Sequence, residues 1–279
     1  MKGASQPQGL TGVLSWIVLS LAMAFAILPI LWGVSTAFKE SGTAESFPPQ
    51  WVPRPITLEN FRQVLLGSNM TRYLWNSTVV ALATILATLG VAVHAGYAAA
   101  RFAFAGKNPL LFLILATAMI PGICILVPVY LLVTAVNLHN TYMALIVVYT
   151  AWQVPTAVWI MRGFFETIQP DLEEAALIDG CSRLGAFYRI ILPLTQPGMA
   201  AVGILVFVYV WNDFLIAYVL TISDEMRLIQ SGLYLYVTAF GVEWSKLMAA
   251  AILALLPPAV TFVLLQSRFI QGLTKGAIR

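Results

Sequence analysis

Charge is scarce in this sequence, since Asp, Glu, Lys and Arg make up only 10% of its 279 residues. A soluble domain carries roughly 25% charged and 45–50% apolar residues, whereas 60% of this chain is hydrophobic. So large an apolar surface needs lipid around it. The composition therefore excludes an ordinary soluble domain and predicts an integral membrane protein.

Cysteine, histidine and basic runs are also scarce, and each scarcity excludes a class of site. Cys124 and Cys181 are too few for a disulfide framework. His94 and His139 have no carboxylate or thiol at ligand spacing, so we expect no metal site. The net charge of +3 comes without a basic run, which argues against nucleic-acid binding. No catalytic constellation of His, Asp, Glu or Cys can be assembled, so an embedded enzyme is not expected.

Long uncharged stretches define the expected membrane spans. The 54 residues between Lys107 and Arg162 would run roughly 80 Å as one helix, against a hydrocarbon core of about 30 Å, so they must fold back. The polar cluster 137–141 supplies the turn. Backbone groups in lipid must be satisfied internally, which favours helices. We therefore expect one all-α membrane domain, residues 1–279, with six transmembrane helices over residues 11–38, 73–100, 108–134, 142–162, 197–223 and 247–267.

The distribution of Lys and Arg between the loops predicts the orientation of the chain. With both termini in the cytoplasm, nine of the fifteen basic residues lie on the cytoplasmic side. They are Lys2, Arg101, Lys107, Arg162, Arg183, Arg189, Arg268, Lys275 and Arg279. This bias places the polar loop 163–196, between the fourth and fifth spans, in the cytoplasm.

That loop carries the signals of two short helices. Pro170 suits the first turn of a helix, and Gly180 suits its C-terminal stop. Ser182 can cap a second helix that runs through Ile191, which Pro193 and Pro197 then end. An ordinary amphipathic helix on the membrane surface would show the same signals, so the helix pattern alone leaves both interpretations open.

A set of motifs in fixed order identifies a family resemblance. The loop matches in full the EAA motif of binding-protein-dependent ABC importer permeases, in Glu174, Ala175, Ala176, Gly180, Ile190, Leu192 and Pro193. Further matches follow the order seen in the carbohydrate-uptake branch: 59–61, 75–77, 97–102, 106–107, 120–121, Pro128, 211–214 and 268–276. The chain resembles the maltose-type second permease subunit over nearly its whole length. Cys181 departs from the pattern, because a smaller residue is expected there.

The resemblance implies a function for the loop. In this family it is a coupling helix that sits in a cleft of a separate ATPase subunit. Glu174 would be its polar anchor, Ala175 and Ala176 the close-packing face that Asp179 shares, and Gly180 the bend. This chain has no G-x-x-x-x-G-K-[ST] phosphate loop, so we expect no cofactor on it and no ATP hydrolysis by it.

The resemblance also implies partners. They would be a second permease subunit, two ATP-binding-cassette ATPase subunits that hold ATP and Mg, and an extracytoplasmic sugar-binding protein. The chain would lie among the lipids of a prokaryotic inner membrane and carry a sugar or oligosaccharide inward. The alternative is an ion-coupled secondary transporter, which would favour several intramembrane ionisable groups.

The motif Trp211-Asn212-Asp213 supplies a second candidate site. Asp213 is the only acidic residue inside a predicted span, and such carboxylates are functional candidates. A role in gating or in structure is favoured over sugar contact, because the family shares the pattern whatever its cargo. The sequence does not reveal the sugar.

Overall fold

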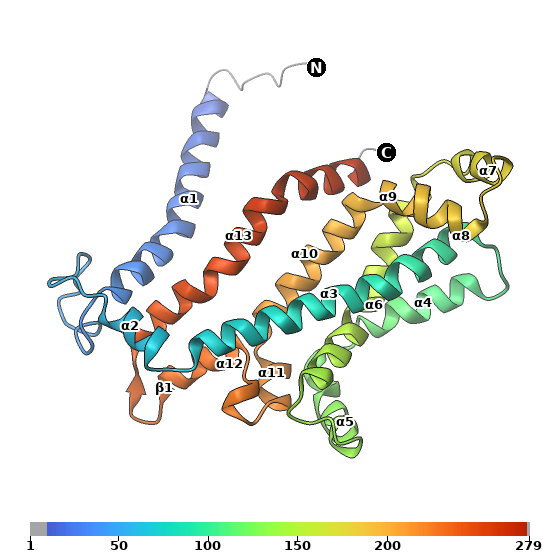
Figure 1. Ribbon diagram of the computed structural model, residues 1–279. Helices are drawn as coiled ribbons and strands as arrows, with labels where there is room; N and C mark the ends of the chain where they lie inside the picture. Colours follow the sequence, from blue (N-terminus) through green and yellow to red (C-terminus); the bar gives the residue numbers. More distant parts are fainter. Residues whose placement is uncertain (1–9, 278–279) are drawn as a thin grey trace. The chain divides into compact units, whose positions relative to one another are not determined.

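The computed structural model describes the backbone of residues 10–277 and the side chains of residues 12–263. Its regular elements are almost all helices (Figure 1), and the described part contains one short antiparallel pair, β1 (Val237–Thr238) and β2 (Gly241–Val242). The expected all-α fold is therefore confirmed. The described residues form two compact units, one from 10–68 with 235–253 and the other from 69–234 with 254–277. The expectation of a single domain stays a prediction.

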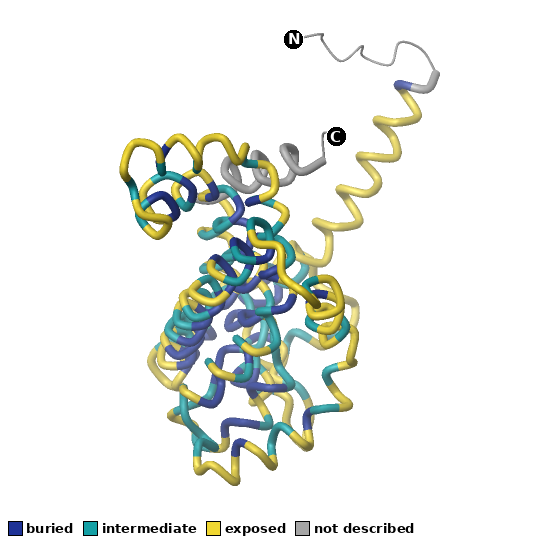
Figure 2. Tube along the Cα trace, turned by 90° about the vertical axis from the view of Figure 1, so that its right-hand side faces the viewer, coloured by how far each residue is buried: buried dark blue, intermediate teal, exposed yellow. Residues whose placement is uncertain are grey.

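The first unit contains α1 (Leu10–Ala37), α2 (Glu59–Leu66), the β1–β2 hairpin and the start of α13 (Trp244–Ala277). Residues 13–31 of α1 are all exposed (Figure 2), and most of them are apolar. A helix that is hydrophobic all round belongs in lipid or in a protein core. Because α1 is 28 residues long and apolar, it can cross a bilayer, as the sequence predicts for residues 11–38.

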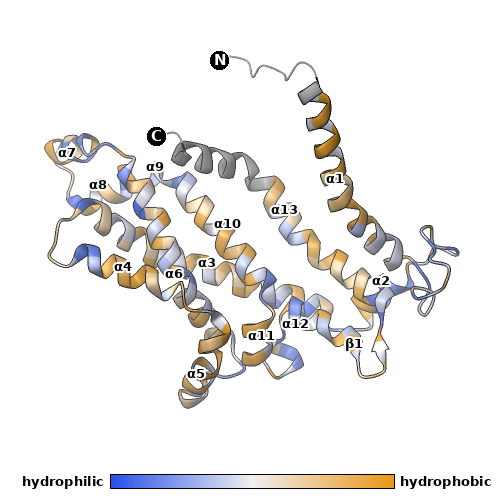
Figure 3. Cartoon of the chain, turned by 180° about the vertical axis from the view of Figure 1, so that it is seen from behind, coloured by the Kyte–Doolittle hydropathy of each residue, from blue (hydrophilic) through white to orange (hydrophobic). Residues whose placement is uncertain are grey.

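The core of the second unit is built on three helices, α3 (Met70–Arg101), α6 (Tyr142–Glu166) and α10 (Gln196–Asn212). Hydrophobic residues dominate along α10, and also along α1 in the other unit (Figure 3). The backbones of α3 and α6 approach closely at Gly96, where an added Cβ would come within 2.9 Å of the Met161 Cβ. These two helices extend slightly beyond the predicted spans 73–100 and 142–162.

The predicted third span, 108–134, is two helices. α4 (Lys107–Thr117) and α5 (Gly122–Ala135) meet at an angle of 92°. Pro121 explains the break, because it lacks a backbone N–H and disfavours helical backbone in the residue before it. The expectation of one continuous helix is therefore wrong at residues 118–121.

The predicted fifth span, 197–223, is also interrupted. α10 ends at Asn212, and α11 (Leu215–Leu220) follows after Asp213 adopts extended backbone with φ −72° and ψ 124°. At its other end α10 is bent by 69° from the helical segment 183–194. In the described residues, four helices are long and apolar enough to span a membrane, or up to six if each bent pair counts as one span.

The remaining elements are short, apart from the last helix. They are α7 (Asp171–Ile178), α8 (Arg183–Ala186), a π-helical turn (Phe187–Ile191), α9 (Leu192–Leu194), α12 (Ile229–Leu233) and the 3-10 turns Asp224–Met226 and Tyr234–Tyr236. α13 begins three residues before the predicted span 247–267 and continues through Ala277. The side chains of motif 268–276 lie outside the described residues, as do the N-terminal Lys2 and the C-terminal Arg279.

Candidate functional site: the coupling loop and the polar contacts of α3

The loop between α6 and α10 folds as two helical segments, as the sequence predicts. Pro170 precedes α7, and Gly180 ends that segment with a φ of +88°, which is left-handed backbone. The Ser182 hydroxyl accepts a hydrogen bond from the Gly185 N–H at 3.1 Å and caps α8. The second segment runs beyond its predicted end at Ile191, however. It continues through the π-helical turn and α9 as far as Leu194, because proline is tolerated in the first turn of a short helix.

Glu173 attaches this loop to α3. Its carboxylate accepts a hydrogen bond from the Tyr97 hydroxyl and lies 3.3 Å from the Arg101 Nε. The Arg101 guanidinium also donates to the Ile168 carbonyl at 2.8 Å. The side chains of Arg101 and Glu173 are only 12% and 14% exposed, so water screens the pair weakly. These contacts fix the start of α7 to the end of a spanning helix.

Aromatic packing completes the attachment. The ring of Phe187, in the π-helical turn, lies 4.5 Å from the Tyr97 ring and 6.1 Å from the Phe165 ring, measured between centroids. Phe187 and Ile191, which both belong to the loop, are buried. The Nε2 of His94 lies 2.7 Å from the Tyr188 hydroxyl, which adds a polar contact at the edge of this cluster.

The residues of the EAA motif lie on different sides of the loop. Glu174, Ala175, Asp179 and Gly180 are exposed, and Pro193 is exposed as well. Ala176 is only 3% exposed, so it packs inside the loop and is not available to a partner, in contrast to its predicted place on the contact face. Ile190 and Leu192 are half-buried. The outward face therefore consists of Glu174 and Ala175 together with the apolar Leu172, Ile178 and Leu184, which no described residue covers.

Asp213 stands at the break between α10 and α11. Its Oδ2 accepts hydrogen bonds from the Tyr149 hydroxyl at 2.8 Å and from the backbone N–H groups of Ile216 and Ala217 at 3.0 and 3.2 Å. The carboxylate thus caps α11 and ties it to α6. This geometry favours the structural or gating role over direct contact with cargo.

The two residues before Asp213 have separate environments. Trp211 is 2% exposed, and its indole N–H donates to the Ala254 carbonyl of α13 at 3.0 Å. Asn212 is exposed and donates back to the Val208 carbonyl of its own helix at 2.8 Å. Trp211 is therefore a packing residue in this structure, and the place of Asn212 and Asp213 in a translocation path stays a prediction.

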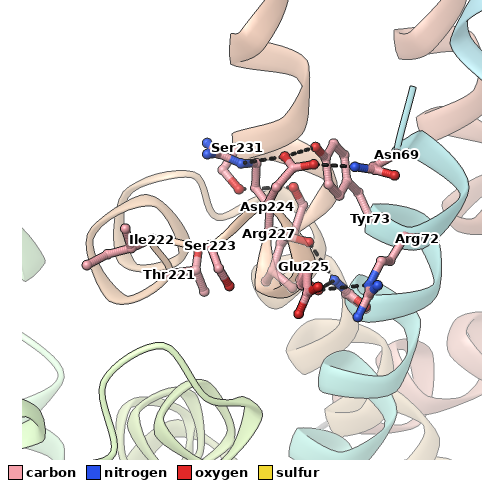
Figure 4. A network of polar contacts seen from close by, with 12 residues as sticks. Asn69, Arg72, Tyr73, Thr221, Ile222, Ser223, Asp224, Glu225, Arg227 and Ser231 are labelled. Atoms are coloured by element: carbon pink, nitrogen blue, oxygen red, sulfur yellow. Dashed lines mark hydrogen bonds and ion pairs between the residues drawn. The ribbon is translucent and has the colours of Figure 1, made fainter. Parts of the chain in front are cut away.

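A polar network holds the segment 221–229 against the other end of α3 (Figure 4). Asp224 accepts hydrogen bonds from the Tyr73 hydroxyl and the Asn69 amide, and it lies 3.5 Å from the Arg227 Nε. The hydrogen bond from Tyr73 is the main cause that lowers the pKa of the Asp224 carboxyl below its ordinary value. Arg72 donates to the Glu225 carbonyl at 3.1 Å.

Asn76 and Ser77 continue the same attachment one turn further along α3. The Asn76 amide donates to the carbonyls of Glu225 and Arg227, at 2.9 Å each. The Tyr142 hydroxyl donates to the Asn76 Oδ1 at 2.7 Å. Ser77 accepts from the Ile229 N–H at 2.8 Å. α3 therefore holds one loop at each of its ends.

Sequence reasoning missed the roles of Glu173, Tyr73 and Asn76. A signal was present, because motifs 75–77 and 97–102 contain Asn76, Tyr97 and Arg101. Their spacing along the chain gives no indication that their partners lie 76 and about 150 residues away. Among the residues that the structure describes, no group of three His, Cys, Asp or Glu side chains is placed to hold a metal ion.

Comparison with known proteins identifies the family. The family described as binding-protein-dependent transport system inner membrane component matches residues 92–275. The sulfoquinovosyl glycerol transport system permease protein SmoH of Agrobacterium fabrum is 34% identical over 266 residues, which is 95% of this chain and 93% of SmoH. The trehalose/maltose transport system permease protein MalG of Thermococcus litoralis is 32% identical over 267 residues, 94% of this chain and 95% of MalG.

A solved structure shows the same fold. It is a bacterial ABC transporter involved in the import of the acidic polysaccharide alginate, and one of its chains matches with a TM-score of 0.83 at 20% identity. The match covers 96% of this chain and 100% of that chain. With motifs, fold and relatives in agreement, the chain belongs to the binding-protein-dependent transport system inner membrane components, the multi-pass permease subunits of ABC importers, in which a separate ATPase hydrolyses ATP.

Proposed function

We propose that this chain forms half of the translocation path of an importer for a sugar or oligosaccharide. The relatives carry sugar names, among them trehalose, maltose and sulfoquinovosyl glycerol. A related alginate transporter is seen in complex with a pentasaccharide-bound periplasmic protein. A second permease chain, two ATPase subunits and an extracytoplasmic sugar-binding protein complete the assembly proposed here.

This proposal rests on one observation: the loop 163–196 is attached to this chain on one side and exposed on the other. Its inner side is attached to α3 through Glu173, Tyr97 and Arg101. Its outer side leaves Ile178 86% exposed and Leu184 68% exposed beside the free carboxylate of Glu174. An exposed apolar patch with a polar rim is typical of a protein interface. The partner that binds this patch is the ATPase subunit. ATP and Mg bind to that subunit, because this chain has no phosphate loop.

The proposed orientation has both termini and this loop in the cytoplasm. It follows from the excess of Lys and Arg on that side. Cysteines introduced at Ser46 and Glu225 would react with an impermeant thiol reagent from outside intact cells, whereas cysteines at Lys107 and Asp171 would react only after the membrane is opened. The reverse pattern would overturn the orientation.

Gly180 provides the test of coupling. An added Cβ at Gly180 meets no atom within 4 Å, so a substitution there acts through the left-handed backbone alone. A β-branched residue in that conformation costs about 1–2 kcal/mol, while Asn tolerates it. Gly180→Val is expected to abolish uptake and weaken co-purification of the ATPase at normal membrane abundance. Gly180→Asn is the matched control and should transport nearly normally. If Gly180→Val transports at the parental rate, the loop is not the transmission element.

A further inference from the structure

The segment 47–58, in the first unit, carries an exposed apolar surface. It connects the turns that follow α1 to the start of α2. Its large apolar side chains are all more than half exposed: Phe47 93%, Trp51 58%, Val52 63%, Ile56 69% and Leu58 66%. Exposed apolar surfaces of this kind mark sites where a protein meets another protein or a membrane. The position of the segment decides between these two partners.

Two contacts tie the segment to the end of α1. The Ser35 hydroxyl donates a hydrogen bond to the Trp51 carbonyl at 2.5 Å, and the edge of the Trp51 ring meets the Trp32 ring, 4.8 Å away between centroids. Further along the segment, the Thr57 N–H donates to the Phe38 carbonyl at 3.0 Å. The segment therefore lies at the level of the last turns of α1.

The exposure of α1 indicates where the lipid ends. Residues 13–31 are all exposed, whereas residues 32–39 are partly or fully buried. The exposed stretch makes about 28 Å of helix, close to the roughly 30 Å of the hydrocarbon core. The membrane boundary therefore lies near Trp32, and Trp51, which packs against it, lies at the same depth. Tryptophan is enriched at this level of a membrane.

The composition of the segment suits the membrane surface. Proline has no backbone N–H, so each proline leaves one donor fewer to be removed from water. Four of the twelve residues are prolines: Pro48, Pro49, Pro53 and Pro55. Arg54 is the single charged residue of the segment, and it is exposed, so its long side chain can reach water. Attachment to lipid would therefore come from the apolar side chains and not from charge.

We propose that the segment 47–58 is a membrane-surface anchor, which inserts Phe47, Val52 and Ile56 among the headgroups and upper acyl chains of the leaflet where α1 ends. In the proposed orientation this is the outer leaflet. Because the segment has one charge, it binds a neutral lipid surface as well as an anionic one. The anchor fixes the depth at which α1 leaves the membrane and α2 begins. It does not depend on the cargo, so it goes beyond the proposed function.

The experiment measures the depth of the segment in the complete importer, held in nanodiscs of phosphatidylcholine. An environment-sensitive dye is attached to Gln50→Cys, in a chain whose Cys124 and Cys181 are replaced by Ser. The quenchers are lipids with a nitroxide near the headgroup, lipids with a nitroxide near the end of the acyl chain, and iodide in the water. Apolar faces of interfacial elements lie about 5–10 Å deep, so we expect the shallow nitroxide to quench about threefold more strongly than the deep one.

Matched variants separate the anchor from other exposed surface. Phe47→Ser, Val52→Ser and Ile56→Ser, combined in one chain, should remove most of the quenching by lipid and raise the quenching by iodide. Leu66→Ser replaces an apolar side chain of α2 that is 81% exposed but lies outside the segment, so it should leave both unchanged. All four side chains are exposed, so neither variant should lower the melting temperature of the importer.

A second dye position calibrates the water phase. Arg62 lies on α2 with its side chain 72% exposed, so a dye on Arg62→Cys should be quenched by iodide and little by either lipid. If the dye at position 50 behaves like the one at position 62, the segment lies in water and the inference is wrong.

Two other outcomes would also overturn the anchor. A dye at position 50 that is shielded from lipid and iodide alike, or becomes shielded only when the binding protein is added, would show that this surface docks a protein. Quenching by lipid that appears only in nanodiscs with anionic lipid would show attachment by charge. Equal quenching in neutral and anionic nanodiscs, lost in the triple variant alone, is the result that supports the anchor.

Discussion

The Tyr97 hydroxyl donates a hydrogen bond to the Glu173 carboxylate, which joins the last turns of α3 to the first turn of α7. The adjacent Glu174 is exposed and has no partner in the described part of the chain. Two neighbouring carboxylates therefore have different surroundings, one facing this chain and the other facing outward. That difference allows their contributions to be separated by mutation.

Glu173→Gln should weaken the attachment of the loop to α3 while leaving most of the binding of the ATPase intact. The substitution removes the charge that Arg101 pairs with at 3.3 Å, and hydrogen bonds to charged groups are worth about 1.5–3 kcal/mol. We expect the ATPase to co-purify while its stimulation by the loaded binding protein falls several-fold. Glu174→Gln should instead reduce co-purification.

A charge exchange controls this result. In the double variant Glu173→Arg with Arg101→Glu, the ion pair can form in the opposite sense, so part of the stimulation should return. Each single variant should be worse than the double. If the stimulation of the ATPase is the same in the two single variants and in the double variant, the ion pair between these residues does not transmit the signal.

Tyr149→Phe and Asp213→Asn should impair uptake to a similar degree for each sugar that the importer accepts. Both changes weaken the contact that ties α11 to α6, because the Asp213 carboxylate accepts hydrogen bonds from Tyr149 and from the backbone of α11. The measurement is competition by a series of deoxy-sugars against the labelled cargo. A site that bonds a particular hydroxyl discriminates strongly against the analogue lacking it. A selectivity change confined to one hydroxyl would therefore show that Asp213 contacts the cargo.

Gly198→Ala should destabilise the second unit, whereas Gly203→Ala on the same helix should be tolerated. A Cβ at Gly198 would lie 2.5 Å from the Phe164 ring, while one at Gly203 meets only the Ile85 methyl at 3.7 Å. Overpacking of this kind costs about 1–3 kcal/mol. The melting temperatures of the two purified variants would be compared by tryptophan fluorescence. Equal melting temperatures would contradict the close packing of α10 on α6.

Acid should release the segment 221–229 from its contacts with α3 only well below neutral pH. The pKa of Asp224 is lowered in the folded chain, chiefly by Tyr73, so its stabilising effect is present above the unfolded pKa of about 3.9 and is lost as the pH falls through the lower folded value. Tyr73→Phe should move the release to higher pH. The anisotropy of a dye on Ile222→Cys, in a chain whose Cys124 and Cys181 are replaced by Ser, would follow the release. A release near pH 7 in the parent would contradict the expected sign.

The sequence predicted the class of fold and most helix positions, because long uncharged stretches and loop signals are local properties. Gly180 and Ser182 show this, since left-handed backbone and capping depend on residues within one turn. The breaks at 118–121 and at Asp213 were missed because a hydrophobicity pattern does not distinguish a straight helix from a bent one. Pro121 was a usable signal for the first of these breaks.

The attachment of the loops was beyond sequence reasoning for another reason. Glu173 was indistinguishable from Glu174 as an acidic residue in the first turn of a helix, where either is favourable. Only the packing of α7 near the end of α3 selects Glu173 as the partner of Arg101. Similarly, nothing near Asn76 in the sequence indicates the carbonyls of Glu225 and Arg227 as its acceptors.

The length of α3 has a mechanical consequence. Its 32 residues make a rod of about 48 Å, well beyond the roughly 30 Å of the hydrocarbon core. Tyr97 and Arg101 lie at one end of that rod, and Tyr73 and Asn76 lie at the other. A rod that pivots about its middle moves its ends in opposite directions, and a rotation of about 10° displaces each end of this one by about 4 Å. A displacement of the loop 163–196 at one end of α3 would thus move segment 221–229, at the other end, in the opposite direction.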